Sequence, residues 1–505
     1  MRNGTDVKET ELDWRVCSRA RLSRDPRFDG KFFIGVRGSG VYCRSIGPAP
    51  TAKEKNCRYF ATAAAAAEAG YRPCLRCRPE SSPGTPAWSG TSTTVARALR
   101  LIGEGGPEDG GIEDLADRLG VGSRHLRRLF LRHLGATPNA VAQTRRVHFA
   151  KKLIDETSLP MTELALAAGY GSVRRFNAAI RKTYHRTPTQ IRAIARRTHA
   201  LPENQYLFRL RFRPPYDWKG MLAFLGAQAT PGVEAVDDNT YRRTISLYGS
   251  DGSLEVSLDS NQPGLCARIQ FGDARALFFI VERLRALFDL NADWAAIVKA
   301  LAGDPLLAAR LKSHPGRRVP GSWSGFELAV RTLVGRQSGA HDAASAAGRM
   351  TRLFGRPFLA GNGLTHFFPE PAPLAEADLS RAGLSDACAE TIRTLARAVL
   401  ADSIRFEGVV DGDGFIARLR EIPGIDAWTA QYVAMRALGE PDAFPSEGER
   451  LEQLSESWRP WRAYAAMYLW GDAERSGSRR DGKSLPLRGL LGEFQPDTEK
   501  IRSIR

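Results

Sequence analysis

Apolar residues recur every three or four positions through the middle of the chain. This period places them on one face of an α-helix, so the pattern predicts a series of amphipathic helices. Ser123, Ser172 and Thr187-Pro188 stand where helix starts and N-caps belong. The ranges that show the helical period are Ile112–Leu119, Arg124–Leu134, Asn139–Asp155, Met161–Ala168, Ser172–Tyr184 and Thr189–Arg197.

The pattern changes at the start of the C-terminal half. Tyr206–Phe212, Arg242–Leu247 and Gly264–Phe271 alternate between apolar and polar residues, as half-buried strands do. From Asp273 onward the spacing is helical again. The sequence therefore predicts a multidomain, mainly α protein whose last domain begins as mixed α+β.

Segments rich in Ser, Pro, Gly or charged residues divide the chain. Glu80–Thr94 and Arg196–Gln205 have the composition of linkers, and a charged stretch begins at Asp472. We therefore expect domains at residues 10–80, 90–197 and 205–472, followed by a flexible tail at 473–505.

The charge balance favours a polyanionic partner. The 505 residues include 73 Lys and Arg against 56 Asp and Glu, a net charge of +17. Val121–Lys152 and Ser172–Arg197 each hold eight Lys or Arg residues and no Asp or Glu, which points to double-stranded DNA rather than to general solubility. Without a membrane-length apolar run or a signal-peptide pattern, the sequence predicts a cytoplasmic protein with no membrane partner.

Each basic run follows a short turn centred on a glycine, Gly120 or Gly169. The stretches LADRLGVGSRHLRRLF and GYGSVRRFNAAIRKTY resemble an AraC-type DNA-binding domain with two helix-turn-helix units. The resemblance implies two recognition helices that enter successive major grooves. The residues that it offers for DNA contact are Arg124, His125, Arg128, Ser172, Arg174 and Arg175.

Four cysteines cluster in the first region, at Cys43, Cys57, Cys74 and Cys77. The last two form a C-x-x-C pair, a spacing that lets two thiolates bind one tetrahedral zinc ion. Free buried thiols are the alternative interpretation.

The segments RDPRFDGKFFIGVRGSGVYCRS and AAAAAEAGYRPCLRCRPE resemble the N-terminal zinc domain of the Ada family. The resemblance implies that four Cys bind zinc, and that the one matched by Cys43 accepts a methyl group from a DNA methylphosphotriester. Zinc keeps such a Cys deprotonated, and a thiolate is a competent nucleophile toward a methyl carbon. Cys74 and Cys77 match the last two ligands.

The second ligand of the Ada pattern falls on Gly47. Cys57 is a candidate for the missing thiolate, which gives the metal set Cys43, Cys57, Cys74 and Cys77. Three Cys with water or another group, and a site that has lost its function, are the alternatives.

Residues 420–438, REIPGIDAWTAQYVAMRAL, predict two helices joined by a tight turn. This segment, with GSWSGFELAVRTLVGRQ and SWRPWRAYAAMYLW, resembles the AlkA family of alkylbase DNA glycosylases. The resemblance implies a helix-hairpin-helix core that holds a DNA phosphate at Gly424 and Ile425. It also implies an aromatic pocket for a flipped base, formed by Trp428, Tyr432 and Trp470.

Two regions depart from the AlkA pattern. Gly335-Arg336-Gln337 matches a loop that presses into the minor groove, where Arg336 replaces the usual Gln and Ser338 and Gly339 also differ from the family. The catalytic Asp, expected three residues after Phe444-Pro445, is replaced by Gly448. Glu447 and Glu449 are the candidates for the catalytic carboxylate, and solvated surface charge is the alternative for both.

We therefore expect a mainly α protein with a small α+β zinc domain, a double helix-turn-helix and a helix-hairpin-helix glycosylase core. It would be activated as a transcriptional regulator by methyl transfer to zinc-bound Cys43, and would excise alkylated purines such as 3-methyladenine. Promoter DNA, alkylated DNA and RNA polymerase are the expected partners, within the nucleoid.

The alternative is a DNA-binding regulator with a decayed glycosylase module. An AraC-type sensor of a small ligand is disfavoured, because the last domain carries hairpin and aromatic motifs.

Overall fold

The computed structural model describes residues 12–83, 93–103, 111–194, 201–337, 340–409, 411–446 and 448–477. The chain forms two compact units. Unit 1 comprises residues 1–218 and 239–296, and unit 2 comprises residues 219–238 and 297–505. The boundary passes through α10 (Trp218–Ala227) and α12 (Trp294–Leu301). Of the predicted tail, residues 478–505 lie outside the described residues.

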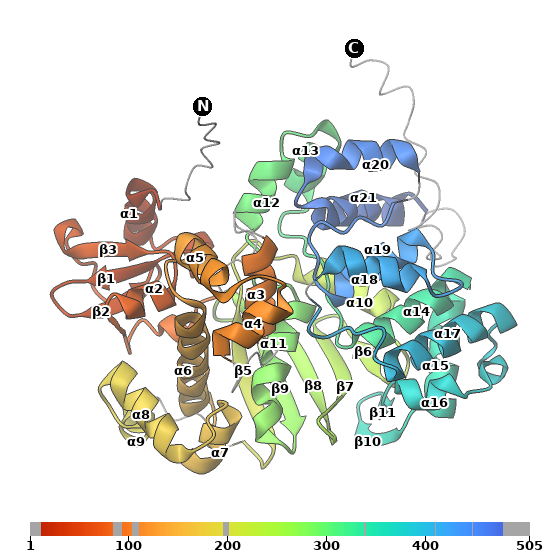
Figure 1. The fold of residues 1–505 in the computed structure, drawn as a ribbon, viewed down its shortest axis with the longest axis horizontal. Helices are drawn as coiled ribbons and strands as arrows, with labels where there is room; N and C mark the ends of the chain where they lie inside the picture. Colours follow the sequence, from red (N-terminus) through yellow and green to blue (C-terminus); the bar gives the residue numbers. More distant parts are fainter. Residues whose placement is uncertain are drawn as a thin grey trace. The chain divides into compact units, whose positions relative to one another are not determined.

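Unit 1 begins with a small sheet in the order β3-β1-β2-β4, flanked by two helices (Figure 1). Strands β1, β2 and β3 pair antiparallel, whereas β4 pairs parallel with β2. Phe32 and Ile34 pack with Cys17 and Ala20 in a buried core beneath α1. The elements are α1 (Trp14–Ser23), β1 (Phe33–Val36), β2 (Val41–Arg44), β3 (Cys57–Phe60), α2 (Ala63–Glu68) and β4 (Arg72–Pro73).

A group of helices follows, and it agrees with the helical period of the sequence. Ser172 caps α8 by accepting a hydrogen bond from the Arg175 backbone, as predicted. Ser123 instead opens α5, whose N-cap is Gly122. The helices are α3 (Thr93–Gly103), α4 (Gly111–Arg118), α5 (Ser123–Leu134), α6 (Pro138–Glu156), α7 (Met161–Ala167), α8 (Val173–Tyr184) and α9 (Pro188–Ile194).

An antiparallel sheet completes unit 1, with neighbouring strands in the order β5-β9-β8-β7. The three predicted strands are present as β5 (Gln205–Arg211), β7 (Thr240–Leu247) and β9 (Gly264–Phe271). Sequence analysis missed β8 (Ser250–Leu258), because Asp251 and Gly252 disfavour a strand. Helix α11 (Leu277–Leu287) follows the sheet, and Phe278 of α11 contacts Phe149 of α6.

The segment after Cys77 is held to α6 by buried charges, although the sequence predicted a linker from Glu80. The side chain of Glu80 is 1% exposed and lies 3.4 Å from Lys151 Nζ. Lys151 also pairs with Asp155 at 2.5 Å, and Arg78 pairs with Asp155 at 2.9 Å. Burial opposes ionisation of Glu80, but Lys151 and Arg78 outweigh it and lower the pKa of Glu80.

Arg213 forms a second connection within unit 1. Its side chain is fully enclosed, with 1% of the residue exposed. The guanidinium donates hydrogen bonds to the carbonyl oxygens of Asp29 at 2.9 Å, Asn291 at 3.0 Å and Pro83 at 3.5 Å. Arg213, which follows β5, therefore joins the cysteine-containing region to the segment after α11.

Unit 2 is mainly helical. Helices α18 and α19 form a hairpin, and α14 packs against α15, α17 and α19 (Figure 1). No helix among the described residues is long and apolar enough to cross a membrane. The further elements are β6 (Glu234–Val236), α13 (Pro305–Ser313), α14 (Gly325–Gln337), α15 (Ala340–Phe354), β10 (Pro357–Gly361), β11 (Leu364–His366), α16 (Pro371–Ala375), α17 (Asp386–Leu400), α18 (Gly412–Arg420), α19 (Ala427–Ala437), α20 (Glu449–Ser455) and α21 (Arg462–Gly477).

Arg213→Ala should destabilise the protein by about 3 kcal/mol, because it leaves buried carbonyl oxygens without their charged donor. Urea unfolding followed by circular dichroism measures the loss. Arg275→Ala is the control, since Arg275 is 71% exposed and pairs only locally with Asp273. Equal stability of the two variants would contradict a stabilising role for Arg213.

Candidate functional site

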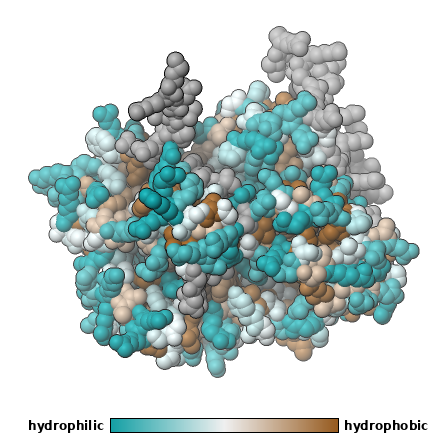
Figure 2. All heavy atoms as spheres, in the orientation of Figure 1, coloured by the Kyte–Doolittle hydropathy of each residue, from teal (hydrophilic) through white to brown (hydrophobic). Residues whose placement is uncertain are grey.

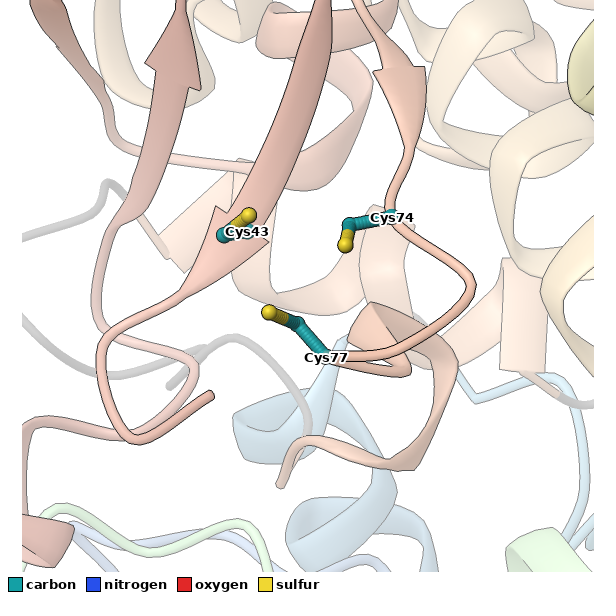
Figure 3. Close-up of side chains that lie close together, drawn as sticks. All are labelled: Cys43, Cys74 and Cys77. Atoms are coloured by element: carbon teal, nitrogen blue, oxygen red, sulfur yellow. The ribbon is translucent and has the colours of Figure 1, made fainter. Parts of the chain in front are cut away.

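Three thiols converge at the edge of the small sheet. Cys43 lies on β2, and Cys74 and Cys77 lie in the turn that follows β4. The parallel pairing of Tyr42 with Pro73 brings the first cysteine beside this turn. The three Sγ atoms lie within 4.8 Å of one another and point toward a common centre (Figure 3). The residues thus offer soft donors at the spacing of a single ion.

The electrostatics of the cluster favour a cation. Hydrogen bonds from the thiols of Cys43 and Cys77 lower the pKa of Cys74 to about 2. Hydrogen bonding with Cys74, and after it with Cys77, raises the pKa of Cys43, because these contacts stabilise its protonated form. Mutual repulsion therefore opposes the ionisation of all three sulfurs, and a bound cation would offset this repulsion. Three thiolates suit zinc, so Cys43, Cys74 and Cys77 would hold it.

The fourth predicted metal residue, Cys57, lies away from this cluster. It is on β3, and β1 separates β3 from β2. Its Sγ lies 3.5 Å from the backbone carbonyl oxygen of Lys53. The structure thus brings together three of the four candidate ligands.

Gly47 lies directly against Cys77. A Cβ added at Gly47 would overlap Cys77 Sγ and would lie 2.8 Å from Cys77 Cβ. The position that carries a ligand in the Ada pattern is therefore adjacent to the thiols, but the side chain of Cys77 leaves no room for a side chain at Gly47. Together with the position of Cys57, this favours the alternative of three Cys with water or another group.

The predicted DNA-contact residues lie on the exposed faces of α5 and α8. Arg124, His125 and Arg128 are exposed on α5, while Leu126 and Phe130 face the core. Arg174 and Arg175 are exposed at the start of α8, and Ser172 is its cap. Figure 2 shows hydrophilic residues over α5 in this view. Both helices thus present guanidinium groups that could reach phosphates and base edges.

The hairpin between α18 and α19 forms as predicted. Gly424 has a φ of 93°, and a Cβ there would overlap Thr391 Oγ1 of α17. Ile425 is buried, and its backbone N–H donates to the carbonyl of Ile422 at 3.1 Å. Asp426 caps α19 by accepting from the Thr429 N–H at 2.7 Å. The turn is therefore rigid enough to position α19.

The three predicted pocket aromatics form one cluster. Trp428 and Tyr432 of α19 stack with ring centroids 4.9 Å apart and planes 17° apart. Trp470 of α21 lies 6.4 Å from the first ring and 6.1 Å from the second. Such rings offer the stacking surface that a flipped base requires.

Sequence analysis missed the polar partners of these aromatics. Arg436 is 4% exposed and donates to Tyr432 Oη and to Gln228 Oε1, each at 2.7 Å. Gln228 precedes Arg436 by 208 residues, so sequence spacing gave no sign of the contact. The structure also moves Gly335, Arg336 and Gln337 from a predicted loop to the last turn of α14.

One of the two candidate catalytic carboxylates lies at the start of α20. Gly448, at the position of the family Asp, has a φ of 111° and precedes α20. Glu449 is the first residue of α20. Glu447 lies outside the described residues. Asp442, a nearby carboxylate in the sequence, is paired with Arg462 at 2.9 Å.

Three sequence families match the chain in succession. The metal binding domain of Ada matches residues 16–80, a helix-turn-helix domain matches 115–194, and the AlkA N-terminal domain matches 207–324. A Mycobacterium tuberculosis protein described as "Probable bifunctional transcriptional activator/DNA repair enzyme AlkA" is 38% identical over 92% of this chain and 97% of its own. The chain therefore belongs to this family of bifunctional transcriptional activator and DNA repair proteins.

Shorter relatives match its parts. Escherichia coli DNA-3-methyladenine glycosylase 2 is 30% identical over 52% of this chain and 96% of its own length. The E. coli "Bifunctional transcriptional activator/DNA repair enzyme Ada" is 32% identical over 34% of this chain and 47% of its own. The predicted Ada-type, helix-turn-helix and AlkA-type segments are thus confirmed, as is the mainly α, multidomain fold.

In this member of the family, Cys77→Ser should strongly reduce bound zinc, because it removes a sulfur from the cluster. Cys57→Ser should leave the zinc content unchanged, since that sulfur lies elsewhere. Elemental analysis of the purified variants measures both. Loss of zinc from Cys57→Ser, with the fold intact by circular dichroism, would show that Cys57 reaches the metal.

Proposed function

We propose that this chain couples a methylphosphotriester sensor to transcriptional regulation, and that it also excises alkylated purines from DNA. The observation that carries the proposal is the convergence of Cys43, Cys74 and Cys77 within unit 1, which also contains the basic helices α5 and α8. The chain's membership of a family of bifunctional activator and repair proteins supports the same conclusion.

Cys43 is the proposed methyl acceptor. Cys43 and Cys74 are both partly exposed, whereas Cys77 is buried, and the resemblance to the Ada zinc domain assigns the acceptor role to Cys43. Zinc, when bound, would supply the positive charge that keeps the sulfur ionised at neutral pH. Cys43 Sγ attacks the methyl carbon, so that a C–S bond forms while the C–O bond breaks. The phosphodiester leaves with the electron pair of that bond.

Methyl transfer removes one negative charge from the sulfur cluster. The charged groups after Cys77 connect this turn to α6, which lies between the two recognition helices in sequence. A less anionic cluster repels the DNA phosphates less, so affinity for DNA rises. As an activator, the DNA-bound chain would then contact RNA polymerase in the nucleoid.

The second activity belongs to unit 2. Trp428, Tyr432 and Trp470 would receive a flipped base, while the hairpin at Gly424 and Ile425 grips the backbone. Glu447 or Glu449 would supply the carboxylate that stabilises positive charge on the sugar as the base leaves. A regulator with a decayed glycosylase module remains the second candidate, because Gly448 occupies the position of the family Asp.

The sensor activity predicts stoichiometric, single-turnover labelling. Protein incubated with DNA that carries radioactive methylphosphotriesters should take up about one methyl group per chain, on Cys43. Cys43→Ser should abolish the uptake, and Cys266→Ser is the control, since Cys266 lies on β9 outside the thiol cluster. Peptide mass spectrometry locates the methyl group, and a label elsewhere would contradict the assignment.

The glycosylase activity is tested separately, by release of 3-methyladenine from methylated DNA. The proposal expects release above background. It also expects a loss of at least about a hundredfold in Glu447→Gln or Glu449→Gln, because one of them carries the catalytic charge. Glu407→Gln is a control in the same unit. No release from a chain that still binds DNA would favour the decayed module.

A further inference from the structure

The ring of Trp428 is covered by a charged side chain. Arg336 lies in the last turn of α14, and its guanidinium carbon is 5.2 Å from the centroid of the Trp428 ring. Trp428 itself is 5% exposed, whereas the Arg336 side chain is 29% exposed. At this position, therefore, an incoming base meets the guanidinium more readily than the bare indole.

A carboxylate pairs with the guanidinium. Arg336 Nη2 lies 2.5 Å from Asp426 Oδ2. Asp426 is itself fixed as the N-cap of α19, two residues before Trp428. The backbone of α19 thus presents both the counter-ion and the ring to the same arginine.

Tyr432, which stacks on the Trp428 ring, is held more firmly than Arg336. Tyr432 is 4% exposed, and its hydroxyl is held by Arg436 at 2.7 Å and by Gln228 at 3.1 Å. The ion pair of Arg336 is partly exposed on both sides, so it constrains the guanidinium only weakly. Arg336 can therefore adjust to a base while it remains near the pocket.

We propose that Arg336 determines the relative specificity of the base pocket, so that neutral damaged purines bind more tightly than cationic ones such as 3-methyladenine. This inference rests on the proposed glycosylase function of unit 2. A guanidinium is planar and forms a stacking surface for a neutral base, and its N–H groups donate to acceptors on a purine edge. A purine that is positively charged by alkylation would compete with Arg336 for the same π-face and would be repelled by it.

The test measures binding, so that it does not depend on catalysis. Fluorescence anisotropy gives the affinity of the full-length chain for three duplexes at one salt concentration. They are an undamaged duplex, one with ethenoadenine, which is neutral, and one with 7-methylguanine, which is cationic and is placed on a fluorinated sugar that resists base release. The quantity compared is the ratio of affinities for the neutral and the cationic lesion.

Arg336→Gln removes the charge and introduces the residue usual in the AlkA pattern. We expect the unmodified chain to prefer the neutral lesion, and Arg336→Gln to shift the ratio about tenfold toward the cationic one. Arg405→Gln is the matched control, because it removes an equal charge from an exposed pair with Asp402 in the same unit. Its ratio should equal that of the unmodified chain.

Two results would overturn the proposal, and they differ in meaning. Suppose that both lesions bind more tightly than undamaged DNA but that the affinity ratio is the same in Arg336→Gln as in the unmodified chain. The specificity role of Arg336 is then wrong, whereas the assignment of the base pocket is retained. If the unmodified chain prefers neither lesion over undamaged DNA, the base pocket itself is rejected.

Discussion

The buried carboxylate of Glu80 is the interaction on which the arrangement of unit 1 depends. It lies among Arg78, Lys151 and Asp155, and its side chain is 1% exposed. An uncompensated charge at such a depth would cost several kcal/mol, so the partners must stay together. Because Arg78 directly follows Cys77, the same charges fix the turn that carries two of the thiols. The sulfur cluster and α6 are therefore connected by buried ion pairs as well as by the intervening chain.

Much of this fold was predictable from local patterns. The helical period located α4 to α9, and a Ser at position 172 predicted the cap of α8, because both signals lie within a few residues. The cysteine ligands were predicted less completely. Spacing identified Cys74 and Cys77, but only the order of the strands shows that Cys57 lies on the far side of β1. Strand order results from long-range pairing, which no local pattern encodes.

In unit 2, too, local motifs were predicted from the sequence and long-range contacts were not. The aromatic residues and the hairpin at Gly424 were found from motifs, and the structure gathers them. Arg436 and Gln228 were missed, because a contact across 208 residues leaves no periodic signal. The family resemblance identified position 336 as unusual, but only the fold shows that its guanidinium lies over an indole. Arg436, which is 4% exposed, is the kind of residue that sequence reasoning tends to leave as surface charge.

The closeness of Gly47 to Cys77 limits how this sulfur cluster could evolve. Gly47→Cys alone would not supply a fourth thiolate, because even its β-carbon would overlap Cys77 Sγ. The turn that carries Cys77 or the segment at Gly47 would have to move first, so a fourth thiolate at this position requires a change in the backbone. With three thiolates around a divalent ion the cluster carries one negative charge fewer than with four, and loss of one thiolate by alkylation would bring it to neutrality.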